Sequence, residues 1–316
     1  MSLKLPLRKF ALLTALCSSV LSACSGVNVL NAVVPSGGYL LRSGVPYGGD
    51  ADQHLDIYIP KAPWAGPGAR PTVMFVHGGS WQSGDKGMYK FVAEAITSRG
   101  WVAVIPDYRK YPKVRWPAFM DDCADAFNWT GAHASEWGGD ARHVLAMGHS
   151  AGAHMATLLA LDPRYLARSP HPVTPAAVIG LSGPYDFLPI TGPDIKEIFA
   201  PAADDLDQTQ PIHFAHAGAP PMLLLHGEND DTVWPKNTRN LAARLRAAGA
   251  QVQEHIYPGM DHIRMVVAVA RPFRFRYTVL DDIEQFVDAQ VVHRAERTGA
   301  GAASAAADAP ALQGAR

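Results

Sequence analysis

The sequence lacks several features that would assign a protein to a class at once. Its 316 residues include only three cysteines, which excludes a disulfide framework, and none of them stands at metal-ligand spacing. The 28 basic residues nearly balance the 29 acidic ones, and no stripe of lysine or arginine suggests a nucleic-acid surface. An acidic cluster, Asp204, Asp205 and Asp207, lacks the glycine of a calcium loop, so we interpret it as solvated surface. We therefore expect no metal, no cofactor and no nucleic-acid partner.

No hydrophobic run is long enough to cross a bilayer, but residues 1–23 have the pattern of a signal peptide. Three basic residues precede the uncharged, mostly apolar stretch Phe10–Ala23. The stretch ends in Leu21-Ser22-Ala23-Cys24, which resembles a bacterial lipobox and implies cleavage before Cys24 and acylation of that cysteine. An ordinary secretory signal with an incidental Cys24 is the alternative. We expect a protein that is lipid-anchored in the bacterial cell envelope, and Ser25 resembles a signal for sorting to the outer membrane.

From about residue 50 onward, buried strands alternate with amphipathic helices. Hydrophobic residues make up 48% of the chain, and the short apolar runs are nearly continuous, as in parallel strands that are covered on both faces. The alternating segment His54–Ile59 predicts an antiparallel edge strand ahead of the parallel set. The expected fold is therefore α/β, with a mostly parallel central sheet and helices on both faces. The predicted parallel strands are Thr72–Val76, Trp101–Ile105, His143–Met147, Ala177–Leu181, Met222–Leu225 and Val252–Tyr257, and the predicted helices are Met88–Ser98, Ala118–Glu136, Ala151–Leu161 and Lys236–Ala248.

Changes in composition predict where the globular domain begins and ends. We expect a tether and entry strand over residues 24–50, one domain over 51–292 and a disordered, Ala/Gly-rich tail over 293–316. The segment 184–221 is long, rich in Pro and Asp, and without periodicity, so it forms a small cap over the strand ends or a plain long loop; we favour the cap. Five apolar residues at helical spacing predict a final amphipathic helix: Phe275, Val279, Ile283, Phe286 and Val287.

Two glycine-rich motifs carry the chemistry. Gly148-His149-Ser150-Ala151-Gly152 follows a predicted strand and opens a predicted helix, the context of a nucleophile elbow that exposes a serine hydroxyl. His77-Gly78-Gly79-Ser80-Trp81 follows an earlier strand, and its glycine pair lets backbone N–H groups approach a substrate oxygen. Acyl transfer needs both a nucleophile and such donors, and the N–H of Ala151, after the serine, is the expected donor from the elbow.

Together these motifs resemble the α/β-hydrolase superfamily. The loop that starts at His77, with Ser83-Gly84-Asp85-Lys86 and Pro106-Asp107-Tyr108-Arg109, is similar to feruloyl- and acetyl-xylan-esterase-like carboxylesterases, and kynurenine formamidases and isoprenylcysteine methylesterases are also similar. The resemblance covers roughly residues 50–292. It implies an α/β-hydrolase fold and oxyanion donors at Gly79 and Ser80.

The serine needs a base, and the base needs an acid to orient it. In this fold the chain order is Ser, Asp or Glu, then His. The predicted strand Met222–Leu225 runs into His226-Gly227-Glu228-Asn229-Asp230, and the resemblance selects Asp230 as the acid, with Asp231 and Asp186 as rivals. His262, in a turn after the last predicted strand, is the expected base.

The expected function is hydrolysis of small carboxylic esters by Ser150, His262 and Asp230 through an acyl-enzyme. An arylformamidase would use the same residues on an N-formyl amide, and a non-catalytic envelope lipoprotein could keep the scaffold for binding; both stay open. Cys123 is expected to be a buried small hydrophobe. Trp81, Trp116, Tyr185, Phe187 and Met260 either line a substrate pocket or pack beneath the cap.

Overall fold

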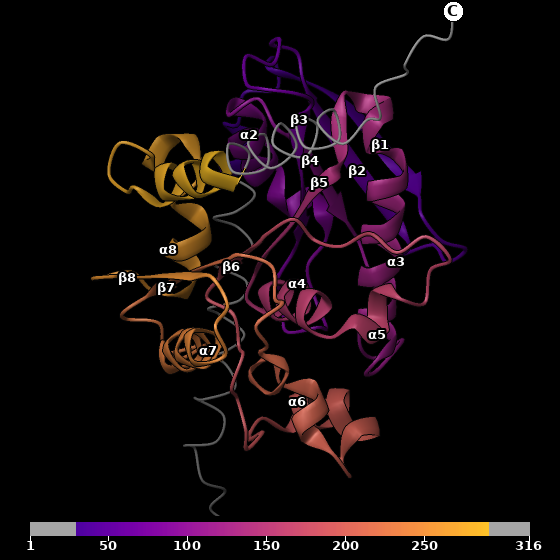
Figure 1. The fold of residues 1–316 in the computed structure, drawn as a ribbon, viewed down its shortest axis with the longest axis vertical. Coiled ribbons are helices and arrows are strands. Elements are labelled where there is room, and N and C mark those ends of the chain that lie inside the picture. Colours follow the sequence, from indigo (N-terminus) through magenta and orange to yellow (C-terminus); the bar gives the residue numbers. More distant parts are fainter. Residues whose placement is uncertain (1–29, 291–316) are drawn as a thin grey trace, which may run out of the picture.

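An eight-stranded, mostly parallel sheet forms the centre of the computed structural model, which describes residues 30–290 (Figure 1). Its strand order is β1-β2-β4-β3-β5-β6-β7-β8, and β3 to β8 run parallel to one another. The predicted signal peptide, Cys24 and the predicted tail 293–316 lie outside the described residues. The strands are β1 (Tyr39–Pro46), β2 (His54–Pro60), β3 (Arg70–Val76), β4 (Val102–Pro106), β5 (Gly139–His149), β6 (Val178–Leu181), β7 (Met222–Gly227) and β8 (Val252–Tyr257).

The edge of the sheet differs from the prediction. β2 is antiparallel, as expected, but it pairs with both β1 and β4 and is therefore internal. β1 takes the edge position, and its residues Leu40 and Leu41 are exposed. Residues of β1 do not alternate between apolar and polar, because only Tyr39 of this strand is buried and nearly all the others are exposed. The pattern that marks a half-buried strand is therefore missing.

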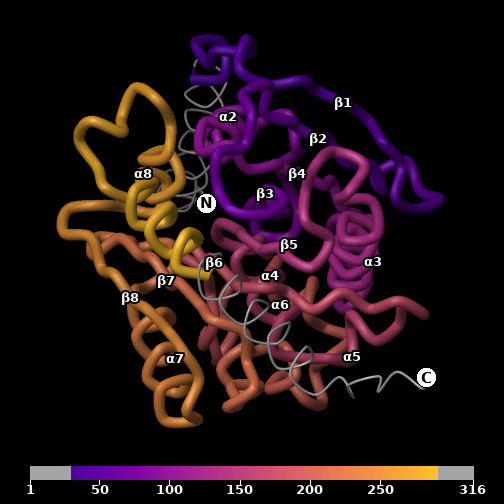
Figure 2. The backbone as a smooth tube through the Cα atoms, turned by 45° about the horizontal axis from the view of Figure 1, so that its top comes forward, coloured from indigo at the N-terminus to yellow at the C-terminus, as the bar shows by residue number. Residues whose placement is uncertain are grey.

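Helices cover both faces of the sheet, and successive strand residues serve opposite faces. In β7, Leu223 and Leu225 belong to one hydrophobic cluster while Met222 and Leu224 belong to another, which explains the continuous apolar run. One face packs on α2, α8 and a helix over residues 279–290, and the other on α3, α4 and α7 (Figure 2). The α-helices are α2 (Lys90–Ser98), α3 (Ala118–His133), α4 (Ala151–Leu161), α5 (Pro163–Leu166), α6 (Pro193–Phe199), α7 (Lys236–Ala247) and α8 (His262–Val267).

The final helix begins later than predicted. Val279, Ile283, Phe286 and Val287 are buried against the sheet, but Phe275 lies in a turn before the helix and is 88% exposed. Its inclusion in the helical face was wrong, because the spacing of Phe275 to Val279 matches a helix although the intervening chain does not continue one. No helix within residues 30–290 is both long enough and apolar enough to span a bilayer.

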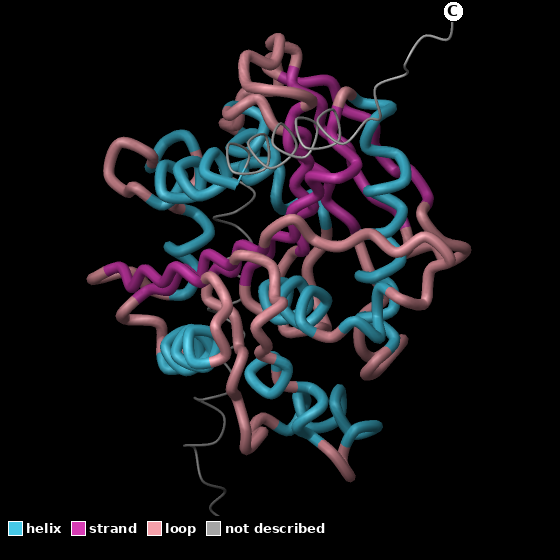
Figure 3. Tube along the Cα trace, viewed as in Figure 1, coloured by secondary structure: helices cyan, strands magenta, loops and turns pink. Residues whose placement is uncertain are grey.

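The segment 184–221, predicted to form a cap, consists of α6, three short 3-10 helices and loops (Figure 3). Ile198 and Phe199 of α6 are fully buried in the cluster that also holds α3 and α4. Cys123 lies in the same cluster and is buried, as predicted, and burial strongly raises the pKa of its thiol. The segment is therefore packed on the domain rather than extended from it.

Candidate active site

Ser150 stands on a sharp turn between β5 and α4. Its backbone has φ 56° and ψ −125°, a conformation that costs a non-glycine residue about 1–3 kcal/mol. The turn is held because the Ser150 N–H donates to the Leu181 carbonyl of the neighbouring strand at 2.9 Å. The side chain is thereby placed beyond the carboxyl ends of the parallel strands, where ligands bind in open α/β sheets.

The glycines around Ser150 are required by close backbone contacts. A Cβ at Gly148 would lie 2.3 Å from the Gly152 carbonyl oxygen, and one at Gly152 would lie 2.0 Å from the Val76 carbonyl oxygen. The start of α4 therefore packs directly on the ends of β3 and β5. Glycine is required at both positions, because a side chain at either one would prevent the sharp turn from β5 into α4 that exposes Ser150.

Ser150, His262 and Asp230 form one chain of hydrogen bonds. His262 Nε2 lies 2.9 Å from Ser150 Oγ, and His262 Nδ1 lies 2.8 Å from Asp230 Oδ2. All three residues are buried, although His262 is 112 positions from Ser150 and 32 from Asp230. The structure thus brings together the three residues that the sequence analysis selected as nucleophile, base and acid.

Asp230 is held as an ionised carboxylate. Burial opposes its ionisation, but hydrogen bonds from His226 and His262 outweigh burial and keep the pKa of Asp230 well below its usual range. Its Oδ1 accepts from the N–H groups of Thr232 and Val233 at 3.1 and 2.8 Å. His226 Nε2 lies 3.2 Å from Asp230 Oδ2, a contact that the sequence analysis did not predict.

The two rival acids point elsewhere. Asp231 is exposed. Asp186 accepts a hydrogen bond from the side chain of Asn240 on α7 at 2.6 Å, and its backbone N–H donates to the Asn237 side chain. Among the described carboxylates, Asp230 is the one that contacts His262.

His149, the residue before Ser150 in the elbow, is a site residue that the sequence analysis did not single out. Its Nε2–H donates to the His262 backbone carbonyl at 3.0 Å, and the two rings pack with centroids 4.7 Å apart. Burial lowers the pKa of His149 to about 3, so the ring is neutral at ordinary pH. The glycine pattern that identified Ser150 gave no signal for this contact, because it joins residues 113 positions apart.

The predicted oxyanion loop has an unusual backbone. Gly79, Ser80 and Trp81 have φ values of 129°, 53° and 59°, three successive residues in the region that favours glycine. The Gly79 carbonyl accepts from the N–H groups of Gln82 and Ser83. Because the C=O and N–H of a trans peptide point in opposite directions, the Ser80 N–H faces away from this turn.

The preceding peptide is tied in the same way. His77 Nδ1–H donates to the Gly78 carbonyl at 2.8 Å, which turns the Gly79 N–H away from the imidazole. His77 itself stacks on Tyr108 and lies 3.5 Å from Asp107, whose carboxylate also pairs with Lys86 at 2.9 Å. A partly buried network thus fixes the base of the loop. None of the described residues accepts a hydrogen bond from the Gly79 or Ser80 N–H groups. The Ala151 N–H, at the first position of α4, has no partner within the helix either.

A pocket of about 230 Å³ opens beside Ser150. Ser80 and Ala151, two of the predicted oxyanion donors, line it together with seven residues of the segment 184–221. The sequence left open whether five aromatic and methionine side chains line a pocket or pack in the core. Trp81 and Phe187 line this pocket, whereas Trp116, Tyr185 and Met260 are buried in the core. Its apolar wall consists of Trp81, Phe187, Pro189, Ile190, Ile195 and Val233.

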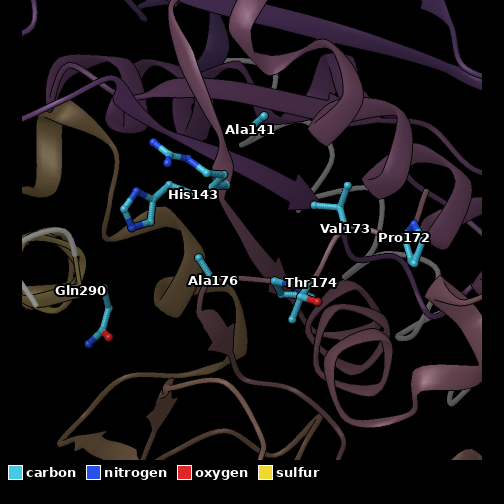
Figure 4. Close-up of a pocket in the computed structure, with 9 residues that line it drawn as sticks. Ala141, His143, Pro172, Val173, Thr174, Ala176 and Gln290 are labelled. Atoms are coloured by element: carbon cyan, nitrogen blue, oxygen red, sulfur yellow. The ribbon is translucent and has the colours of Figure 1, made fainter. Parts of the chain in front are cut away.

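A second hollow, of about 460 Å³, lies at the other end of the sheet (Figure 4). Residues 141–143 in the N-terminal half of β5, the segment 172–176 and Gln290 line it. Ser150 follows the carboxyl end of β5, so this hollow and the Ser150 hydroxyl lie at opposite ends of the strands. Because open α/β sheets bind ligands at the carboxyl ends of their strands, the smaller pocket is the candidate site.

A serine on a strained turn after a central strand, followed along the chain by an acid and then a histidine, defines the α/β-hydrolase class. The solved structure of esterase B from Lactobacillus rhamnosis has this chain's fold, with a TM-score of 0.78 and 19% identity over 92% of this chain and 98% of that one. Within the class, the protein belongs to the BD-FAE family, whose family model matches residues 55–245.

The curated relatives with similar sequences include an esterase and a probable methylesterase. Esterase LipC of Mycobacterium tuberculosis is 31% identical over 243 residues, which are 71% of this chain and 60% of LipC. The probable isoprenylcysteine alpha-carbonyl methylesterase ICMEL1 of Arabidopsis thaliana is 26% identical over 70% of this chain and 51% of its own length. The matched part of this chain therefore spans only half to three fifths of these relatives.

Proposed function

We propose that the protein hydrolyses small carboxylic esters through a covalent acyl-enzyme on Ser150. The observation that carries the proposal is the hydrogen-bonded chain from Ser150 through His262 to Asp230 at the mouth of an apolar pocket. Membership of the BD-FAE family and similarity to the esterase LipC support the same reaction.

In the first half of the reaction, His262 Nε2 takes the proton of the Ser150 hydroxyl as the oxygen attacks the ester carbonyl carbon. The positive charge that develops on the imidazole is stabilised by the ionised Asp230 at Nδ1. Collapse of the tetrahedral intermediate expels the alcohol, to which His262 returns the proton. Water then repeats the sequence on the acyl-enzyme and releases the carboxylic acid.

The negative charge on the carbonyl oxygen needs donors that are already in place. We assign this role to the N–H groups of Gly79, Ser80 and Ala151. The first two belong to peptides whose carbonyls are tied back into the protein, and the third lies at the start of α4, so none of them has an acceptor within the described residues. Loss of one such donor in an enzyme of this type lowers turnover by about 100- to 1,000-fold.

The pocket favours a short acyl chain. At about 230 Å³ it is smaller than the roughly 300–1,000 Å³ of sites that enclose drug-sized molecules. Its apolar wall from the cap segment suits a small aliphatic group beside the reacting carbonyl.

The test is hydrolysis of p-nitrophenyl acetate and butyrate by the purified chain and by a Ser150→Ala variant. We expect turnover by the wild type, only residual activity in the variant, and fluorophosphonate labelling that depends on Ser150. Equal rates for the two proteins would exclude the mechanism. N-formylkynurenine, tested alongside, distinguishes an esterase from an arylformamidase, and no turnover of any substrate would leave the scaffold as a binding module.

We further propose that the protein is attached to the bacterial envelope by acyl chains on Cys24. The lipobox-like sequence that ends at Cys24 supports this proposal. Mass spectrometry of the mature N-terminus should show a modified cysteine as its first residue, and an unmodified residue at or after position 24 would contradict lipidation.

A further inference from the structure

The segment between α8 and the final helix presents aromatic and basic side chains to solvent. It reads Arg271-Pro272-Phe273-Arg274-Phe275-Arg276-Tyr277, and we call it the basic–aromatic loop. Phe275 is 88% exposed and Phe273 37%, and Phe275 is the most exposed large hydrophobic side chain of residues 30–290. An aromatic ring so far from the core contributes nothing to packing and is more typical of a contact surface.

The exposure of Phe275 is built into the loop. The guanidinium of Arg274 turns inward, where it pairs with Glu94 of α2 and donates to the Val269 carbonyl at 2.8 Å. The N–H groups of Arg276 and Tyr277 both donate to the Phe273 carbonyl. With the residues on each side of Phe275 tied down, its ring is held outward.

The charge of the loop is positive and partly uncompensated. Arg271 and Arg276 are exposed, and within residues 30–290 neither forms an ion pair with a carboxylate. The Arg276 guanidinium instead lies 5.7 Å from the centre of the Tyr277 ring. The Arg276 Nε also donates to the Tyr277 hydroxyl at 3.4 Å. Aromatic rings flanked by guanidinium groups that have no carboxylate partner match a surface that is apolar inside and anionic at its boundary.

The loop lies beside the first residues that the structure describes. Helix α2 joins the two, because Asn31 donates to the carbonyls of Gly87 and Met88 just before α2, while Arg274 pairs with Glu94 within it. Arg271 also shares a small hollow with residues 35–39. Figure 2 shows the yellow segment that holds this loop on the same side of the molecule as α2. Val33, two positions after Asn31, has a side chain that is 61% exposed.

This position suits the proposed anchor. Leu30 is six positions after Cys24, so even a fully extended chain spans at most about 22 Å between them. An acylated Cys24 would therefore hold the α2 face of the domain close to the lipid.

We propose that the basic–aromatic loop docks on an anionic phospholipid surface, with Phe273 and Phe275 in the interfacial layer and Arg271 and Arg276 on lipid phosphates. The inference builds on the proposed anchor but not on the proposed hydrolysis. Its test uses residues 25–316, a chain that contains every described residue and no acyl chain, so the loop is measured apart from the anchor.

Co-sedimentation with vesicles of phosphatidylcholine alone, and with 30% phosphatidylglycerol added, measures the binding. We expect the chain to bind the anionic vesicles more tightly, and added salt to weaken that binding. Phe275→Ser should weaken it at least about tenfold. The double variant Arg271→Gln, Arg276→Gln should weaken it about 25-fold, or roughly fivefold for each arginine.

Matched controls are available on α7, which lies far from α2 in Figures 1 and 2. Trp234→Ser, just before α7, removes another exposed aromatic ring, and Arg244→Gln removes another exposed arginine; both should bind like the wild type. The melting temperature should not change in any variant.

Equal binding to both kinds of vesicle, or losses in the controls as large as those in the loop variants, would overturn the proposal. If light scattering shows a dimer that Phe275→Ser dissociates, the occupant is a second copy of the chain and the lipid assignment is wrong. An unmodified Cys24 would remove the anchor while leaving the vesicle result to stand by itself.

Discussion

Replacing Asp230 with asparagine tests the proposed mechanism most directly. The carboxylate accepts from His262 through Oδ2 and from two backbone N–H groups through Oδ1. An asparagine that keeps its oxygen on the backbone donors turns its NH2 group toward His262 Nδ1, so two donors face each other. The imidazole then moves its proton to Nε2, which donates to Ser150 instead of accepting from it.

The size of the effect follows from this change of tautomer. In triads of this kind the Asp→Asn change lowers kcat about 10⁴-fold, which is about 5.4 kcal/mol of transition-state stabilisation. Because Asp230 does not line the pocket, KM should change little. Steady-state hydrolysis of p-nitrophenyl butyrate at pH 7.5 gives both constants.

Asp231→Asn is the matched control, since it removes the same charge from the adjacent, exposed position. It should keep turnover within about twofold of the wild type, as expected of a surface change. If Asp230→Asn stays within tenfold of the wild type, or if Asp231→Asn loses as much, the assigned acid is wrong. Circular dichroism and thermal unfolding confirm that both variants are folded.

Three further changes probe the surroundings of the site. His149→Phe keeps a ring beside His262 but removes the hydrogen bond that the imidazole donates to the His262 carbonyl, so we expect kcat to fall about tenfold with little change in KM in the same assay. Ile195→Trp narrows the pocket, and kcat/KM should fall at least tenfold more for butyrate than for acetate esters. Burial lowers the pKa of His149 to about 3 and of His154 to about 4. Below pH 6.5 the unfolded chain therefore binds more protons than the folded chain does. The free energy of unfolding, measured with urea, should be lower at pH 5 than at pH 7 by roughly 2 kcal/mol for each histidine. His154→Leu should remove about half of this pH dependence, and a stability that does not change between pH 5 and pH 7 would contradict the prediction.

Much of the fold and site was predictable because the signals are local. Strands that are covered on both faces leave continuous apolar runs, and a serine elbow needs glycines at fixed spacing, so β3 to β8 and Ser150 follow from short stretches of sequence. The order of acid and base along the chain then narrows the choice to a few residues. Asp230 was separated from Asp231 by resemblance, and the structure shows the physical difference: one carboxylate is buried between two imidazoles and the other faces solvent.

Most of the features that sequence reasoning missed depend on distant partners. His149 matters through a carbonyl 113 positions away. His226 contacts Asp230 only four positions along the chain, but the conformation of the turn decides that its ring faces that carboxylate. Phe275 has the right spacing for the final helix, but a turn held by Arg274 and α2 takes it out of that helix. For His149 and Phe275 the deciding contact joins segments that no short window of sequence contains.

The burial of Cys123 makes the protein well suited to site-specific labelling. A thiol reacts as its thiolate, and a raised pKa in a closed apolar cluster keeps this side chain from maleimides and iodoacetamides. In the chain of residues 25–316, which starts after Cys24, a single introduced cysteine would be the one accessible thiol. A polarity-sensitive dye on Phe275→Cys would then report by its colour whether that position enters an apolar layer, and the same dye on Trp234→Cys would supply the reference colour in water.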